Sequence, residues 1–127
     1  MKRLVLTCAT AAAAAAVLLA GLPANAQPAL PDQCVLTRLI QGHTVANDGH
    51  TLYLGANGTD VYQVTTGGPC LAHATASDTL ILRDRGMGKI CHPLDLDLTV
   101  RGTRCVVDKF VKLSPAEIAA LPKRLQP

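Results

Sequence analysis

The stretch that decides the fold is Leu-Asp-Leu-Asp-Leu-Thr-Val, which spans residues 94–100. Apolar and polar residues alternate at every position of this stretch. Because successive side chains of a β-strand point to opposite faces, strict alternation predicts a strand with one buried and one solvated face. The buried face would carry Leu94, Leu96, Leu98 and Val100, and the solvated face Asp95, Asp97 and Thr99.

Upstream of this stretch, turn signals separate three further strand-like runs at residues 38–46, 51–55 and 61–66. The first turn is Asn47-Asp48-Gly49 and the second is residues 56–59, which contain Asn-Gly. Asn and Gly tolerate positive φ and favour tight hairpin turns. The third run is rich in β-branched residues, which suit a pleated strand. The pattern therefore predicts two consecutive β-hairpins.

The remaining segments complete a mainly β fold with one C-terminal helix. Residues 79–83 and 105–113 have the composition of strands. Ser114-Pro115-Ala116-Glu117 has the pattern of a capping box with proline in the first turn, which predicts a helix over 115–121. We therefore expect about six short antiparallel strands in a meander or small barrel, followed by this helix.

The N-terminal segment, residues 1–26, has the pattern of a cleavable signal peptide. Lys2 and Arg3 precede an apolar run over residues 4–22, and Ala-Asn-Ala ends at Ala26, before Gln27. A membrane anchor is the alternative, but a spanning helix needs about 20 strongly apolar residues and this run is dominated by alanine. We expect cleavage between Ala26 and Gln27, export to the periplasm or the extracellular space, and no stable membrane insertion afterwards.

Composition limits what the remaining chain can be. Without Lys2 and Arg3, 10 basic and 9 acidic residues remain, so most of the net charge of +3 is lost. This near balance argues against a nucleic-acid binder held by bulk charge. A length of 127 residues argues against several domains or a large enzyme. Residues 27–33, with two prolines, are expected to form a flexible lead-in. Residues 34–127 are expected to form a single small domain.

Four cysteines remain after cleavage: Cys34, Cys70, Cys91 and Cys105. No two of them form the Cys-x-x-Cys motif of metal or thioredoxin-like sites. Because the chain is expected to be exported, the four cysteines predict two structural disulfides. Four cysteines allow three connectivities. In an up-and-down meander, Cys34 and Cys91 would lie at one end and Cys70 and Cys105 at the other. This arrangement favours Cys34–Cys91 and Cys70–Cys105.

The surroundings of the cysteines carry a family resemblance. The matching features are Cys34-Val35, Asp48 before Thr51-Leu52-Tyr53-Leu54, Pro69-Cys70, Ile90-Cys91, Cys105-x-Val107-x-x-Phe110, and the tail from Leu113 to Leu121. With these features, the chain from Cys34 to Leu121 resembles a family of small exported proteobacterial proteins of unknown function. The chain departs from the family pattern after Cys91, where His92-Pro93-Leu94 precedes Asp95. The resemblance implies export and a cysteine-stapled fold, and it implies no activity.

The most suggestive chemical cluster is His92, Asp95 and Asp97, which could offer oxygen and nitrogen ligands to a cation. Alternation alone also explains the two aspartates as a solvated strand face. The other histidines, His43, His50 and His73, show no ligand spacing.

A nucleophilic enzyme is not expected. The only serines are Ser77, which lacks a G-x-S-x-G frame, and Ser114, which caps the helix. We therefore expect a non-catalytic binding or accessory module of the cell envelope, with no cofactor and with an envelope protein or ligand as partner. The alternative is a metal-binding protein or small enzyme built on the loop of His92, Asp95 and Asp97.

Overall fold

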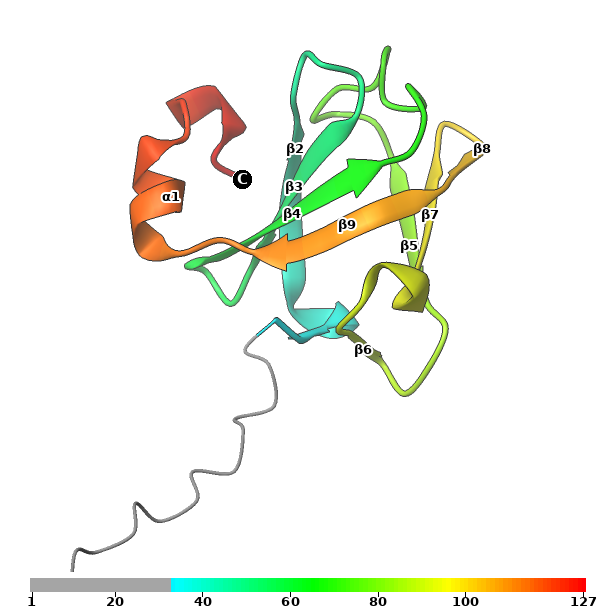
Figure 1. Cartoon of the computed structure of the whole chain (residues 1–127), viewed down its shortest axis with the longest axis horizontal. Coiled ribbons are helices and arrows are strands. Elements are labelled where there is room, and N and C mark those ends of the chain that lie inside the picture. The colour runs from blue at the N-terminus through cyan, green and yellow to red at the C-terminus, as the bar shows by residue number, and fades with distance from the viewer. Residues whose placement is uncertain (1–32) are drawn as a thin grey trace, which may run out of the picture.

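The computed structural model describes residues 33–127 (Figure 1). The signal peptide expected from the sequence, its cleavage site between Ala26 and Gln27, and the lead-in up to residue 32 lie outside the described residues. The described chain is mainly β, with antiparallel sheets, one α-helix and three short 3-10 helices. No helix within residues 33–127 has the length and hydropathy needed to cross a bilayer.

The larger sheet contains four strands in the order β2-β3-β4-β9. Their bounds are β2 Ile40–Val45, β3 Thr51–Ala56, β4 Asp60–Thr66 and β9 Val107–Lys112. The first three strands form the two hairpins that the turn signals predict. In the first turn, Asp48 Oδ1 accepts the backbone N–H groups of His50 at 2.9 Å and Thr51 at 2.8 Å.

A second sheet contains β5 (Leu80–Asp84), β7 (Leu96–Val100) and β8 (Thr103–Cys105), in the order β5-β7-β8. The structure divides the predicted last strand, 105–113, at Val106. Cys105 ends β8, which pairs with β7, and after Val106 the chain continues as β9, which pairs with β4 (Figure 1). With β8 and β9 taken as one bent strand, six strands run in the order β2-β3-β4-β9/β8-β7-β5. This order departs from a simple meander, because the last strand in the chain, β8/β9, lies between β4 and β7.

A two-stranded ladder pairs β1 (Val35–Leu36) with β6 (Lys89–Ile90), and Val35 lies opposite Ile90. The ladder brings the adjacent residues Cys34 and Cys91 together, with 4.1 Å between their Cα atoms. The second disulfide joins Cys70, in the loop after β4, to Cys105 at the end of β8, with 5.9 Å between Cα atoms. Both predicted disulfides are confirmed.

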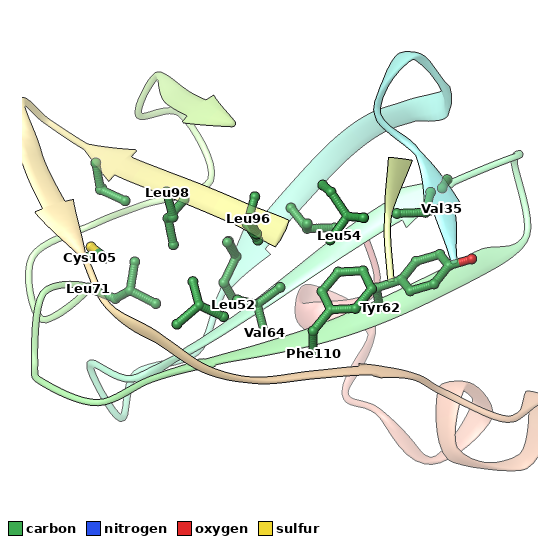
Figure 2. Packing of buried hydrophobic residues seen from close by; sticks show 14 residues of the cluster. Val35, Leu52, Leu54, Tyr62, Val64, Leu71, Leu96, Leu98, Cys105 and Phe110 are labelled. Atoms are coloured by element: carbon green, nitrogen blue, oxygen red, sulfur yellow. The ribbon is translucent and has the colours of Figure 1, made fainter. Parts of the chain in front are cut away.

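The core lies between the inner faces of the two larger sheets (Figure 2). Leu52, Leu54 and Val64 come from the four-stranded sheet, and Leu96, Leu98 and Val100 come from β7. Tyr62 and Phe110 stack at one end of this core, with ring centroids 5.3 Å apart (Figure 2). The Tyr62 hydroxyl donates to the carbonyl of Cys34 at 3.3 Å, which ties the aromatic pair to the first disulfide.

The C-terminal segment covers part of the outer face of the larger sheet. It contains α1 (Pro115–Ala120) and η3 (Lys123–Leu125). The predicted capping box is present, because Ser114 Oγ accepts the Glu117 N–H at 3.3 Å and Glu117 Oε2 accepts the Ser114 N–H at 2.7 Å. The helix ends one residue before the predicted Leu121, which takes an extended conformation ahead of Pro122. A second apolar cluster forms here from Tyr53, Val61, Leu113, Ile118, Leu121 and Leu125.

Candidate docking surface

The structure corrects the start of the predicted strand at residues 94–100. Residues Pro93–Asp95 form a 3-10 helix, η2, and β7 begins only at Leu96. Leu94, which we expected on the buried face, is 79% exposed. The physical reason is local, because Asp95 Oδ2 accepts the backbone N–H groups of Cys91 at 3.0 Å and His92 at 2.9 Å. These hydrogen bonds stabilise a turn in competition with the extended strand.

The two candidate carboxylates therefore do not share a strand face. Hydrogen bonds from the N–H groups of Cys91 and His92 lower the pKa of Asp95 and so favour its charged form, outweighing a weaker desolvation effect. Asp97 remains on β7, and its Oδ1 lies 3.0 Å from Nε of Arg104. Each carboxylate thus has its own protein partners.

The other predicted candidates are scattered over the fold. His43 lies on β2, His50 in the turn before β3, and His73 in the loop after β4. Ser114 caps α1, and the N–H of Ser77 donates to Thr75 Oγ1 at 3.3 Å within its loop. In the described part of the chain, no three His, Cys, Asp or Glu side chains gather as a metal site.

The structure instead brings together two exposed apolar side chains that are distant in sequence. Leu94 and Val106 line the same hollow, which has a volume of about 270 Å³. Pro93, Arg85 and Arg104 line it as well. We call these five residues, Arg85, Pro93, Leu94, Arg104 and Val106, the Leu94–Val106 surface.

Each apolar side chain of this surface is held outward by the fold. Val106 is 72% exposed, whereas its neighbours Cys105 and Val107 are buried. Because Cys105 is fixed by the disulfide to Cys70, the alternation leaves the Val106 side chain pointing away from the core. Leu94 lies on η2, three residues after the disulfide-bonded Cys91. Each disulfide therefore anchors a segment that presents one exposed apolar side chain.

The polar part of the surface consists of two arginines. Arg104 pairs with Asp97, and the side chain of Arg104 remains 64% exposed. Arg85 is exposed, and its backbone N–H donates to the Asp95 carbonyl at 2.9 Å, which fixes it beside η2. Among the ion pairs of residues 33–127, none includes Arg85.

Other depressions, including two large ones, lie on the described surface. One of about 650 Å³ adjoins Val106 on the side of Pro69 and Cys70, and it shares Arg104 with the first hollow. The other, of about 730 Å³, lies beside α1 and includes Leu113, Ile118 and the Asp60–Lys112 ion pair, whose atoms are 3.3 Å apart. Val106 thus separates two neighbouring hollows and is accessible from both.

Sequence reasoning missed the Leu94–Val106 surface because alternation assigned Leu94 to the core. A signal for the correct structure is present in the sequence. Pro93 followed two residues later by Asp95 matches the start of a helical turn, with proline at the first position and an acidic residue at the third.

Comparison with known proteins gives no match: no family model, no curated protein and no solved structure is similar to the chain. Two disulfides in a chain of this size are typical of an oxidising, exported environment.

Proposed function

We propose that this chain is an exported, non-catalytic binding or accessory module of the cell envelope that contacts its partner through the Leu94–Val106 surface. One observation carries the proposal. Two large apolar side chains, distant in sequence, are mostly exposed around one hollow, and each lies on a segment anchored by a disulfide. Exposed apolar side chains gathered beside polar ones are typical of interaction sites.

Rigidity supports this function. A surface that is already fixed before binding loses little conformational entropy when a partner docks. Here the Asp95 hydrogen bonds fix η2, and the Cys70–Cys105 disulfide fixes the residue next to Val106. Covering the exposed parts of Leu94 and Val106 would contribute about 25 cal/mol for each Å² of apolar area removed from water.

The proposed location is the periplasm or the extracellular space. The predicted signal peptide and the family resemblance support export, and the two disulfides support an oxidising compartment.

Site-specific crosslinking in cells tests the proposal. A photo-reactive residue is placed at Leu94 or Val106, and at Lys123 as an exposed control on η3, on the other side of the molecule (Figure 1). We expect the same discrete adduct from positions 94 and 106 and not from position 123. Equal adducts from all three positions, or none from 94 and 106, would contradict the proposed docking surface.

A melting experiment separates this function from a metal-dependent one at His92, Asp95 and Asp97. We expect the melting temperature to be unchanged by Zn²⁺, Ca²⁺ or EDTA and to fall with reductant, because the disulfides stabilise the fold. A large shift with one metal that disappears in His92→Ala would instead support the metal-binding alternative.

A further inference from the structure

We propose that the Leu94–Val106 surface recognises a peptide segment in which an apolar side chain lies next to a carboxylate. This inference rests on the proposed function and adds the chemistry of the partner. It follows from the size of the hollow, from its apolar walls and from the charge of its arginines.

The size of the hollow favours a side chain over a free cofactor. Its volume of about 270 Å³ lies just below the range of ligand pockets, which span about 300–1,000 Å³. The exposed walls are Leu94 and Val106, Pro93 is half-buried, and the buried residues Leu96 and Val107 also line the hollow. Apolar walls of this kind suit one branched or aromatic side chain of a partner.

The charged residues that line the hollow favour a carboxylate beside that side chain of the partner. Arg85 and Arg104 line the hollow together with one carboxylate, Asp97, and Asp97 is paired with Arg104. Arg83 lies opposite Asp97 in the β5–β7 register and is also exposed. Among the residues that line the hollow there are two guanidinium groups and one carboxylate, so a partner carboxylate near Arg85 would be attracted and could form a bidentate pair.

A peptide fits this surface better than an anionic membrane. The folded part of the chain carries nearly balanced charge, so it provides no broad basic face for a bilayer. The arginines flank a hollow of limited size, which suits one short segment with two adjacent side chains.

The test uses the oxidised chain without residues 1–26 and blocked peptides with a central Leu-Glu, Leu-Gln or Leu-Lys pair. Binding is followed by amide chemical shifts. We expect the Leu-Glu peptide to shift the amides of Arg85, Leu94 and Val106, with at least threefold weaker binding by Leu-Gln and weaker still by Leu-Lys. Added salt should weaken only the Leu-Glu complex, because its carboxylate pairs with an exposed arginine.

Variants assign the effect to the surface. Arg85→Gln should reduce binding of the Leu-Glu peptide to the level of Leu-Gln, and Arg124→Gln on η3 should leave binding unchanged. Leu94→Asp should abolish binding of all three peptides while the melting temperature stays close to that of the parent chain, since Leu94 is exposed.

Several results would overturn the inference. Equal binding of the three peptides would show that no carboxylate is selected, and binding unaffected by Arg85→Gln would show that Arg85 does not recognise one. Shifts that depend on protein concentration alone would identify a second copy as the occupant, and shifts caused by anionic phospholipid vesicles and not by Leu-Glu would identify a membrane. If no peptide binds while crosslinks from positions 94 and 106 persist, the peptide chemistry is wrong and the docking function stands. If those crosslinks are absent too, both fail.

Discussion

The carboxylate of Asp95 accepts the backbone N–H of His92 at 2.9 Å, and this contact redirects the chain ahead of β7. It closes the turn of η2, so that Leu94 faces solvent while Leu96 enters the core. This local hydrogen bond thereby exposes Leu94, one of the two exposed apolar side chains of the Leu94–Val106 surface.

Replacing Asp95 with Asn should lower the melting temperature at pH 7, because the amide is a weaker acceptor than a carboxylate. The folded-state pKa of Asp95 is lowered from its ordinary value of 3.8. A lowered pKa contributes stability above the unfolded value, and that stability is lost as pH falls through the folded value. Thermal melts between pH 7 and pH 2 should therefore show a smaller acid destabilisation in Asp95→Asn than in the parent chain.

Asp97→Asn is the matched control for this prediction. It removes a partly exposed ion pair with Arg104, and such pairs contribute about 0–1 kcal/mol. An unchanged pH profile in Asp95→Asn would show that the carboxylate does not stabilise η2.

Removing either disulfide should destabilise the fold by about 2–4 kcal/mol. The cysteines are 57 residues apart in Cys34–Cys91 and 35 apart in Cys70–Cys105. Loop-closure entropy makes the first contribution larger by only about 0.4 kcal/mol. Chemical denaturation of the two double Cys→Ser variants measures both costs. Free thiols in the unreduced protein without residues 1–26 would contradict the two disulfides.

Gly49 and Gly58 form a matched pair for testing how the loop after β4 packs. Both have positive φ, +74° and +77°, so alanine at either position is strained by about 1 kcal/mol. A Cβ at Gly49 would also lie 3.1 Å from the Cα of Ala72, whereas a Cβ at Gly58 meets open space. Gly49→Ala should therefore lower the free energy of unfolding by more than Gly58→Ala, as urea denaturation would show. Equal losses would mean that the loop does not pack against the first turn.

Local patterns in the sequence were enough to predict the local elements. The Asn-Asp-Gly and Asn-Gly turns predicted both hairpins, and Ser114 with Glu117 predicted the capped helix. The disulfide pairs were predicted correctly, although a simple meander is not what brings them together. Cys34 meets Cys91 because of the β1–β6 ladder, whose two-residue strands are too short to leave a periodic pattern.

Non-local pairing was not predictable in this way. Nothing within residues 105–113 indicates that the strand changes sheets at Val106, because β9 pairs with β4 about 45 residues earlier in the chain. The docking surface depends on this switch, since Val106 lies at the point where it occurs. The surface also depends on the Asp95 turn, which interrupts an otherwise regular alternation.

Leu94 and Leu96 provide the sharpest test of that interruption. Leu96→Ala removes a side chain from the core and should cost about 2–5 kcal/mol. Leu94→Ala alters an exposed side chain and should change the free energy of unfolding by less than about 0.5 kcal/mol. Urea denaturation of both variants measures the difference. A continuous strand from residue 94 would bury both leucines and make the two losses of unfolding free energy similar. Equal losses would therefore refute the η2 turn. They would also refute the exposed position of Leu94, on which the docking surface depends.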